Sequence, residues 1–189
     1  MSTRDNTFIN IEDRIIYLHD YVDADSIAKI NYWLLDILRK DDKLENESKS
    51  FTRQPIKFYI NSNGGNVDDM WSLVTIMLKS KTPIYTYCTS YAHSCGLLIF
   101  LAGSKRFISD FSYMLLHQLS FGKSGKLQHV DEYVDVVKIE NQYMINYITS
   151  RCNISKEKVE EVFKCQQDYY MFTDELLELG VATDMIEEF

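Results

Sequence analysis

The segment Phe58-Tyr-Ile-Asn-Ser-Asn-Gly-Gly65 predicts a strand that runs directly into a double-glycine turn. β-Branched and aromatic residues over 56–60 predict the strand, and the residues over 67–79 predict a helix after the turn. Glycine allows a close backbone approach that a side chain would block. We therefore expect a strand, turn and helix that leave backbone N–H groups available at the turn.

Strand and helix patterns alternate on both sides of this unit. Upstream, a strand is predicted over 14–18 and a helix over 25–39, with Asp23 or Asp25 as its cap. Downstream, the predicted elements are strands over 84–88, 106–108 and 113–116 and a buried helix over 95–102. Such alternation implies right-handed crossovers and a largely parallel sheet, with active groups at the carboxyl ends of its strands.

Two further stretches differ from this pattern. The residues from Lys40 to Ser50 are charged and show no periodicity, so we expect a surface loop there. A glycine-bearing extended segment covers 121–127, and a long helix over 128–150 follows, with apolar residues Val130, Val134, Val137 and Met144. A long helix must bury its apolar stripe, but the stripe does not say whether its partner is the same domain or another subunit.

A serine, a histidine and an aspartate occur in an order and in contexts that suggest a serine peptidase. They are Ser94, His117 and Asp168, in the segments Tyr91-Ala-His-Ser-Cys-Gly96, Met114-Leu-Leu-His-Gln118 and Gln167-Asp-Tyr-Tyr-Met-Phe-Thr173. A serine becomes a nucleophile when a histidine takes its proton, and a carboxylate orients that histidine. Each residue alone has an ordinary structural explanation, so the hypothesis depends on their joint occurrence. Ser94 also stands before a predicted helix, whose N-terminal dipole would stabilise negative charge.

The two neighbours of Ser94 are rivals for these roles. Adjacent side chains diverge, so His93 would struggle to reach the Ser94 hydroxyl. Cys95 could serve as the nucleophile, since a helix N-terminus lowers a thiol pKa, but we prefer a packing role because free cysteines are commonly buried. The cysteines at 88, 95, 152 and 165 show neither a C-x-x-C pair nor the spacing of a zinc site, so no metal or cofactor is predicted.

Together with the double-glycine segment, these motifs resemble the Clp protease proteolytic subunit (ClpP) family from about Arg14 to Ile186. The resemblance implies an α/β, ClpP/crotonase-like fold with repeated β-β-α and βα units and a mostly parallel sheet. It also implies a protruding handle made of a strand and a long helix. Residues 1–189 would form one peptidase domain, with a head at about 14–118 and 165–189 and a handle at about 119–164.

The same resemblance implies a serine-type endopeptidase. Ser94 would be the nucleophile, His117 the base and Asp168 its orienting carboxylate, while the backbone N–H groups of Gly65 and Cys95 would hold the oxyanion. Substrate backbone would add as a strand to the extended segment, at Gly122, Lys123, Ser124 and Gly125. The alternative is a catalytically silent ClpP-like structural or regulatory ring subunit. An acyl-CoA enzyme on the crotonase-like fold is weaker, because it leaves the Ser–His–Asp set unexplained.

Composition and resemblance together define the expected partners. The family acts on peptides or unfolded proteins as a homo-oligomer of stacked rings. The net charge of -8 argues against nucleic acid, which requires a basic face. No apolar run reaches the length of a membrane span, and the N-terminus lacks the apolar region of a signal peptide. We therefore expect neither a nucleic-acid nor a membrane partner, and a cytoplasmic location.

Two departures from the family pattern bear on whether this chain docks to an AAA+ unfoldase. Only 13 residues precede the strand that begins at Arg14, so we expect the family's axial loops and first helix to be largely missing. The positions of the family's apolar docking pocket include Lys57, Lys79 and Thr89, and an ammonium there disfavours an apolar anchor. The resemblance therefore implies a Clp serine endopeptidase of the ATP-dependent type, but these departures argue against docking to an AAA+ unfoldase without excluding it.

Overall fold

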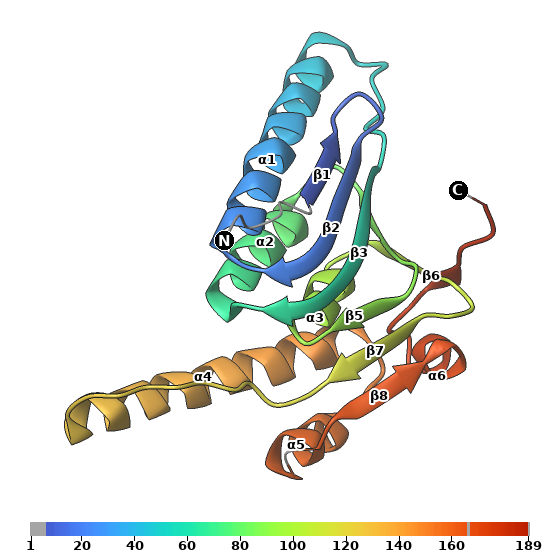
Figure 1. The fold of residues 1–189 in the computed structure, drawn as a ribbon. Helices are drawn as coiled ribbons and strands as arrows, with labels where there is room; N and C mark the ends of the chain where they lie inside the picture. The colour runs from blue at the N-terminus through green and yellow to red at the C-terminus, as the bar shows by residue number, and fades with distance from the viewer. Residues whose placement is uncertain (1–6, 166, 189) are drawn as a thin grey trace.

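The chain folds around a curled β-sheet with helices stacked against it (Figure 1). The structure, a computed structural model, describes residues 7–165 and 167–188. No helix in this part of the chain combines the length and the hydropathy that a membrane span requires. Its elements are β1 Thr7–Asn10, β2 Ile15–Val22, α1 Ala24–Glu47, β3 Ile56–Gly65, α2 Val67–Lys79, β4 Ile84–Cys88, β5 Tyr91–His93, α3 Cys95–Leu101, β6 Lys105–Ile108, β7 Tyr113–Leu116, α4 Leu127–Arg151, α5 Lys156–Cys165, β8 Tyr169–Phe172, α6 Thr173–Glu178 and β9 Asp184–Met185.

β3 lies at the centre of the sheet and pairs with three other described strands. The strand order is β8-β7-β5-β3-β4-β6-β9, and β3 also pairs with β2, which in turn pairs with β1. The first half of β3 pairs in parallel with β4, and its far end pairs in parallel with β5. Among the described strands, only β1 and β8 lie antiparallel to their neighbours. The predicted, largely parallel sheet is therefore present.

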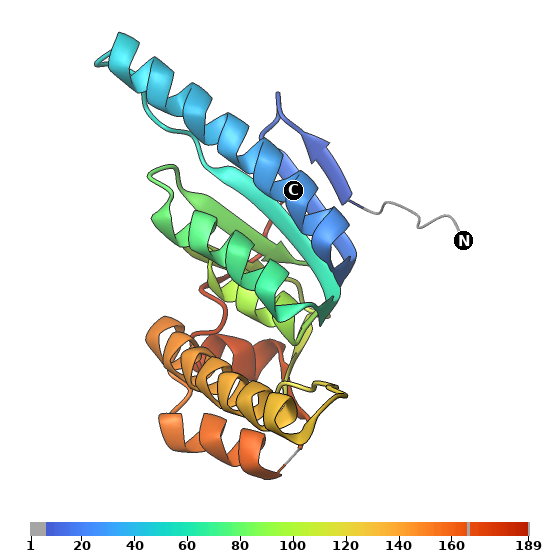
Figure 2. The same cartoon turned by 90° about the vertical axis from the view of Figure 1, so that its left-hand side faces the viewer.

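The two faces of the sheet differ in chemistry. Phe58 of β3 is fully buried in the core, whereas the next residue, Tyr59, is only partly buried. Tyr59 stacks on Tyr87 of β4 with centroids 4.8 Å apart, and Tyr87 stacks on Phe107 of β6 at 4.7 Å. Helices α1, α2 and α3 follow one another on the opposite, aliphatic face (Figure 2). This period-two alternation buries one face of each strand and leaves aromatic rings on the other.

α1 begins one residue before its predicted start and ends eight residues after its predicted end. The Asp23 carboxylate accepts a hydrogen bond from the Ser26 N–H at 2.9 Å, and the Ser26 side chain completes a capping box. The helix then continues to Glu47, so the prediction of a surface loop from Lys40 to Ser50 is wrong for most of that stretch.

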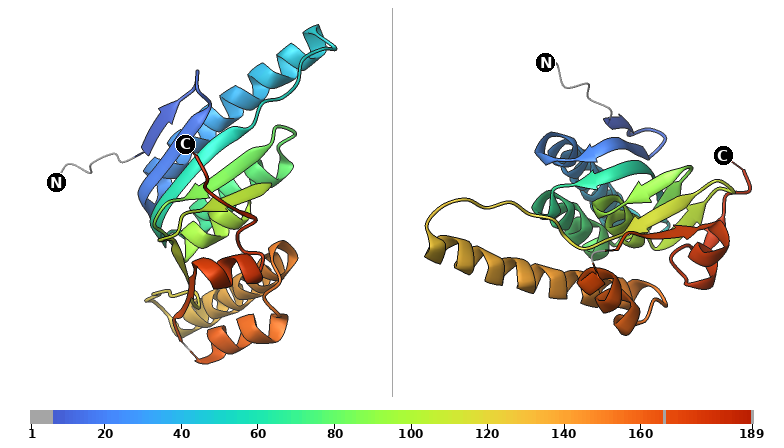
Figure 3. Two further views of the ribbon diagram at one scale, coloured as in Figure 1. Left: turned by 90° about the vertical axis from the view of Figure 1, so that its right-hand side faces the viewer. Right: turned by 60° about the horizontal axis from the view of Figure 1, so that its bottom comes forward.

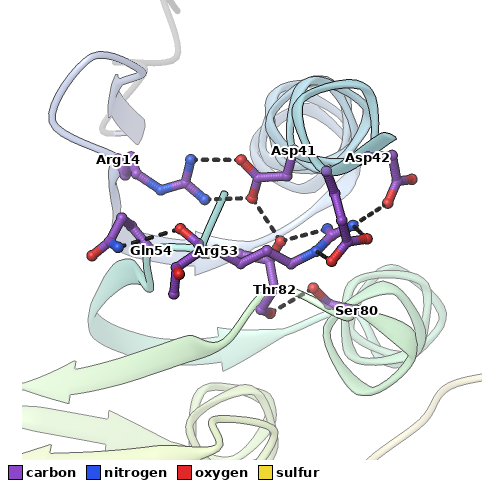
Figure 4. Close-up of polar contacts among 9 residues, drawn as sticks. Arg14, Asp41, Asp42, Arg53, Gln54, Ser80 and Thr82 are labelled. Atoms are coloured by element: carbon purple, nitrogen blue, oxygen red, sulfur yellow. Dashed lines mark hydrogen bonds and ion pairs between the residues drawn. The ribbon is translucent and has the colours of Figure 1, made fainter. Parts of the chain in front are cut away.

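A buried ion pair explains the additional turns of α1 (Figure 4). Asp41 is 1% exposed and accepts hydrogen bonds from Arg14 at 3.0 and 2.7 Å and from the Thr82 hydroxyl at 2.6 Å. Arg53 donates to Glu45 at 3.1 and 2.7 Å and to Thr82 at 3.0 Å. Charges that look solvated in the sequence are therefore paired with residues far away along the chain.

α4 is the predicted long helix, with each end displaced by one residue. Its C-terminal half packs on the core, where Met144 is buried and the Tyr147 hydroxyl donates to the Leu98 carbonyl of α3 at 3.0 Å. Its N-terminal half projects from the body (Figure 3), and Val130 and Val134 there are only partly buried. This chain therefore covers only part of the predicted apolar stripe.

The predicted strand of the handle is absent from the single chain. Residues 117–126 between β7 and α4 form no strand, and residues 120–126 are exposed. A strand requires a hydrogen-bonding neighbour, and none of the described strands pairs with this segment. The segment instead runs alongside α4 as irregular chain (Figure 3).

Six short elements are not predicted from the sequence. They are β1, β5, α5, β8, α6 and β9. Strands of two to four residues contain too few positions for a period-two pattern, and they form because a neighbouring strand offers hydrogen bonds.

Candidate active site

Three parallel strands bring predicted site residues to one edge of the sheet. β3 pairs with β5, and β5 pairs with β7, both in parallel. β3 ends with Gly64 and Gly65, Ser94 directly follows β5, and His117 directly follows β7. The carboxyl ends of adjacent parallel strands are the usual place for reactive groups in α/β folds.

Ser94 occupies a strained turn between β5 and α3. Its φ of 54° and ψ of -122° lie outside the regions that residues other than glycine favour. Its N–H donates to the Leu115 carbonyl at 2.9 Å, and its carbonyl accepts from the Leu98 N–H at 3.3 Å. β7 and α3 thus hold the turn from both sides, as strain of this kind requires. Among the serines that the structure describes, Ser94 is the only one with a positive φ.

The double glycine lets β3 touch this turn. A Cβ on Gly64, whose φ is 91°, would lie 2.7 Å from the Ser94 Cβ and 2.9 Å from the Cys95 nitrogen. Gly65 has a φ of 150°, and a Cβ there would lie 2.1 Å from the Val22 carbonyl oxygen. Both positions therefore exclude a side chain. Gly65 is among the predicted site residues and Gly64 is not, although the Gly-Gly pair was the available signal.

The register of β7 and β8 places His117 beside Asp168. These strands are antiparallel, and Leu116 at the end of β7 pairs with Tyr169 at the start of β8. His117 and Asp168 are the next residues along the two strands, directly beyond this last pair. Both residues also line one cavity of about 560 Å³. Because β8 is not predicted from the sequence, the proximity of these residues is a result of the tertiary structure.

Ser94 and His117 share a second cavity of about 50 Å³, which Gly65 and Cys95 also line. His117 borders both the cavity that Ser94 lines and the cavity that Asp168 lines. Asp168 itself is exposed. Within residues 7–165 and 167–188, no hydrogen bond joins Ser94 to His117 or His117 to Asp168. The structure therefore brings Ser94, His117, Asp168, Gly65 and Cys95 into one region. It does not link the serine, the histidine and the aspartate by hydrogen bonds.

Cys95 is buried beside Ser94 and has the properties of a packing residue. Its Sγ donates to the Gly65 carbonyl at 3.3 Å. Burial raises the pKa of the Cys95 thiol to about 11, so the thiolate is scarce at neutral pH. Because the thiolate is the reactive form of cysteine, Cys95 is a poor nucleophile here.

His93 lies among aromatic rings. Its ring centroid is 5.1 Å from that of Tyr91 and 5.0 Å from that of Tyr113, and Tyr170 of β8 meets it edge-on at 6.2 Å. Its Nε2 is buried and has no hydrogen-bond partner among the described residues. Burial, and then the nearby charge of His117, lower the pKa of His93. A neutral imidazole is therefore favoured close to the predicted base.

The predicted substrate-binding residues line neither of these cavities. They lie in the exposed segment before α4, which α4 supports: the Lys123 Nζ is 5.0 Å from the centroid of the Tyr133 ring, and Phe121 meets that ring edge-on at 5.7 Å. A Cβ at Gly122 or Gly125 would meet no atom within 4 Å, so space is open on this side of the backbone.

Comparison with known proteins agrees with the fold. A family model described as Clp protease matches residues 6–189. The chain belongs to the Clp protease family. This Clp protease family member is 29% identical to the ATP-dependent Clp protease proteolytic subunit 2 of Treponema pallidum (strain Nichols) over 144 residues, 75% of this chain and 71% of that protein. It is 24% identical to the ATP-dependent Clp protease proteolytic subunit 1 of Shouchella clausii (strain KSM-K16) over 178 residues, 93% of this chain and 86% of that protein.

The fold of this Clp protease family member also matches a solved structure. It superimposes on a ClpP1 mutant from Listeria monocytogenes with a TM-score of 0.79, covering 94% of each chain at 18% sequence identity. The predicted ClpP fold and family membership are thereby confirmed.

Proposed function

We propose that this Clp protease family member is a serine endopeptidase that works through Ser94, His117 and Asp168. The Ser94 Oγ attacks the peptide carbonyl while His117 takes its proton, and His117 then gives that proton to the leaving amine. Asp168 orients His117 and stabilises its imidazolium form, and the N–H groups of Gly65 and Cys95 hold the oxyanion. Water, activated by the same histidine, then hydrolyses the acyl-enzyme.

The strained Ser94 turn beside His117 is the observation that carries this proposal. A structural serine needs neither a φ of 54° nor an imidazole lining the same cavity. Strain at a strand-to-helix turn is typical of exposed serine nucleophiles in α/β hydrolases. The protonated thiol of Cys95 leaves Ser94 as the better nucleophile at this position.

Peptides or unfolded proteins are the proposed substrates. The segment that carries Gly122, Lys123, Ser124 and Gly125 is exposed and has no strand partner in the described chain. An extended peptide paired with it would supply the missing strand and run towards the cavity that His117 and Asp168 line. Within this proposal the chain is one domain with a head at about 14–118 and 165–189 and a handle at about 119–164.

The proposed active form is a cytoplasmic homo-oligomer of stacked rings assembled through α4. Val136, Ile139 and Tyr143 are 48%, 52% and 60% exposed. They are spaced three and four residues apart, so they form one apolar stripe on the helix surface. An exposed stripe of this kind is typical of an interface. The names of the two bacterial relatives describe ATP-dependent proteases, but no proposed step consumes ATP, so we expect cleavage of short peptides without it.

Covalent labelling with a fluorophosphonate, read by intact-mass spectrometry, tests the proposal directly. An activated serine reacts far faster than an ordinary one, so we expect one adduct on the wild type and none on Ser94→Ala. Ser72→Ala is the matched control, because Ser72 is an exposed serine on α2 outside the site, and this variant should label like the wild type. Ser94→Ala should lose both the label and the hydrolysis of short peptides, whereas Ser72→Ala should lose neither.

A catalytically silent ring subunit is the second candidate, and the exposed Asp168 favours it. Without hydrogen bonds from Ser94 to His117 and from His117 to Asp168, the described chain does not show a closed proton-transfer path. This candidate predicts that the folded, assembled wild type takes no fluorophosphonate adduct and cleaves no peptide.

A further inference from the structure

The cavity beside Ser94 is small and lined mainly by apolar side chains. It measures about 50 Å³ and lies between the site and the core. Ser94 and His117 form its reactive side. Its apolar walls include Leu98 of α3, Leu116 of β7, Met144 and Ile148 of α4, and Phe163 of α5. A substrate whose carbonyl carbon meets the Ser94 Oγ would have the side chain of the same residue close to these walls.

The walls of this cavity belong to the close-packed core. Met144 is 4% exposed and Phe163 is 5% exposed, and both contact the main cluster of buried residues. The hydrogen bond from Tyr147 to Leu98 fixes α4 against α3 next to the cavity. Side chains in a close-packed core cannot easily move aside for a larger group. The volume of the cavity is therefore a constraint on the substrate.

We infer that this cavity receives the side chain on the acyl side of the cleaved bond and restricts it to small apolar residues such as alanine. This inference rests on the proposed peptidase function. An apolar cavity of about 150 Å³ binds benzene. A cavity of about 50 Å³ accepts a methyl group and excludes the side chain of phenylalanine. Met144 and Phe163 are the specificity-determining residues, since they close the cavity from α4 and α5.

The larger cavity of about 560 Å³ is the competing location for that side chain. It is lined by His117, Gln118, Phe121 and Asp168, but not by Ser94. The volume of this cavity would not restrict the size of a side chain bound there. The preference of the enzyme between alanine and phenylalanine at this position therefore decides between the two cavities.

Hydrolysis of succinyl-Ala-Ala-X-aminomethylcoumarin peptides, with X as alanine, leucine or phenylalanine, tests the inference. We expect kcat/KM for alanine to exceed that for phenylalanine by about tenfold or more, because one methylene in an apolar pocket already changes discrimination by about that factor. Met144→Ala and Phe163→Leu enlarge the cavity and should each raise the leucine-to-alanine ratio by about tenfold. Met77→Ala is the control, since Met77 is also 4% exposed but lies on α2 outside the cavity.

The possible outcomes separate the inference from the proposed function. If Ser94 takes the fluorophosphonate and the wild type prefers phenylalanine, the peptidase stands and the small cavity is not the binding site. If both cavity variants fail to fold, the wild-type preference still decides. If the wild type neither takes the label nor cleaves a peptide, the proposed function fails and the inference fails with it.

Discussion

Gly64 at the end of β3 lies close against the Ser94 turn, and each residue restricts the other. Ser94 needs a positive φ to follow β5 and begin α3, and Gly64 must then approach within a distance that no side chain permits. The reactive geometry at the scale of single residues therefore depends on a residue with no chemistry of its own.

Gly64→Ala should damage the site more than it damages the fold. The new Cβ would displace the Ser94 turn, and a misplacement of about 1 Å can lower activity by about 100-fold. The strained φ and the contact should also lower the free energy of unfolding by about 1–3 kcal/mol. Peptide hydrolysis and thermal denaturation measure the two effects. Gly122→Ala has open space and should leave the melting temperature unchanged, and wild-type hydrolysis by Gly64→Ala would contradict the close approach.

His93 should make stability depend on pH. Burial and the charge of His117 lower the pKa of His93 below its ordinary value of 6.5, so the folded state binds this proton less well than the unfolded state. Stability is then fully present above about pH 6.5 and falls as the pH is lowered towards the folded-state pKa. Thermal denaturation between about pH 7.5 and about pH 5.5 should show a smaller decrease for His93→Phe than for the wild type. Equal decreases would contradict the assignment to His93.

At the scale of elements, the end of α1 is held by charges from other parts of the chain. Burial would raise the pKa of Asp41, but the hydrogen bonds from Arg14 and Thr82 and the charges of Arg14 and Arg53 outweigh burial and hold this pKa below its usual value of 3.8. Asp41 therefore contributes stability above about pH 4, and this contribution is lost as the pH falls through its lowered pKa.

Asp41→Ala should destabilise the protein by about 2–4 kcal/mol, because it leaves Arg14 without its buried partner. Asp36→Ala is the matched control on the same helix. Asp36 pairs with Lys40 at 2.8 Å on the surface, so its loss should change the free energy of unfolding by less than about 1 kcal/mol. Urea denaturation at neutral pH measures both. Similar losses for the two variants would show that the buried network does not hold α1.

At the scale of the whole molecule, α4 carries an apolar stripe that this chain leaves uncovered. Its C-terminal half belongs to the core beside Ser94, while the stripe of Val136, Ile139 and Tyr143 faces outward. The same helix therefore links the proposed active cavity to the proposed subunit interface.

The double variant Val136→Asp/Ile139→Asp should dissociate the proposed oligomer. Burying two carboxylates in an apolar interface should weaken association by about 100-fold or more. Sedimentation velocity measures the oligomeric state, and circular dichroism should show unchanged helix content because both residues are exposed. Gln142→Asp adds a carboxylate on a neighbouring side of α4 and should assemble like the wild type. Unchanged assembly of the double variant would exclude this stripe as the interface.

The sequence alone determined the elements that have strong local patterns. The bounds of α2 and β4 are as predicted, and those of α4 differ by one residue at each end, because apolar periodicity and flanking prolines or glycines are local signals. The identities of Ser94, His117 and Asp168, and the glycine pair before α2, are likewise fixed by the sequence. What these residues do together is not a local property.

The features that depend on residues far apart in the chain follow from the tertiary structure and not from local patterns. α1 continues because Asp41 meets Arg14 and Thr82, and Asp168 comes beside His117 because β8 pairs with β7. The cavity beside Ser94 takes its size from side chains on α3, α4 and α5. Pairing and packing energies arise between distant segments, whereas a sequence pattern reports only which side of each segment is apolar.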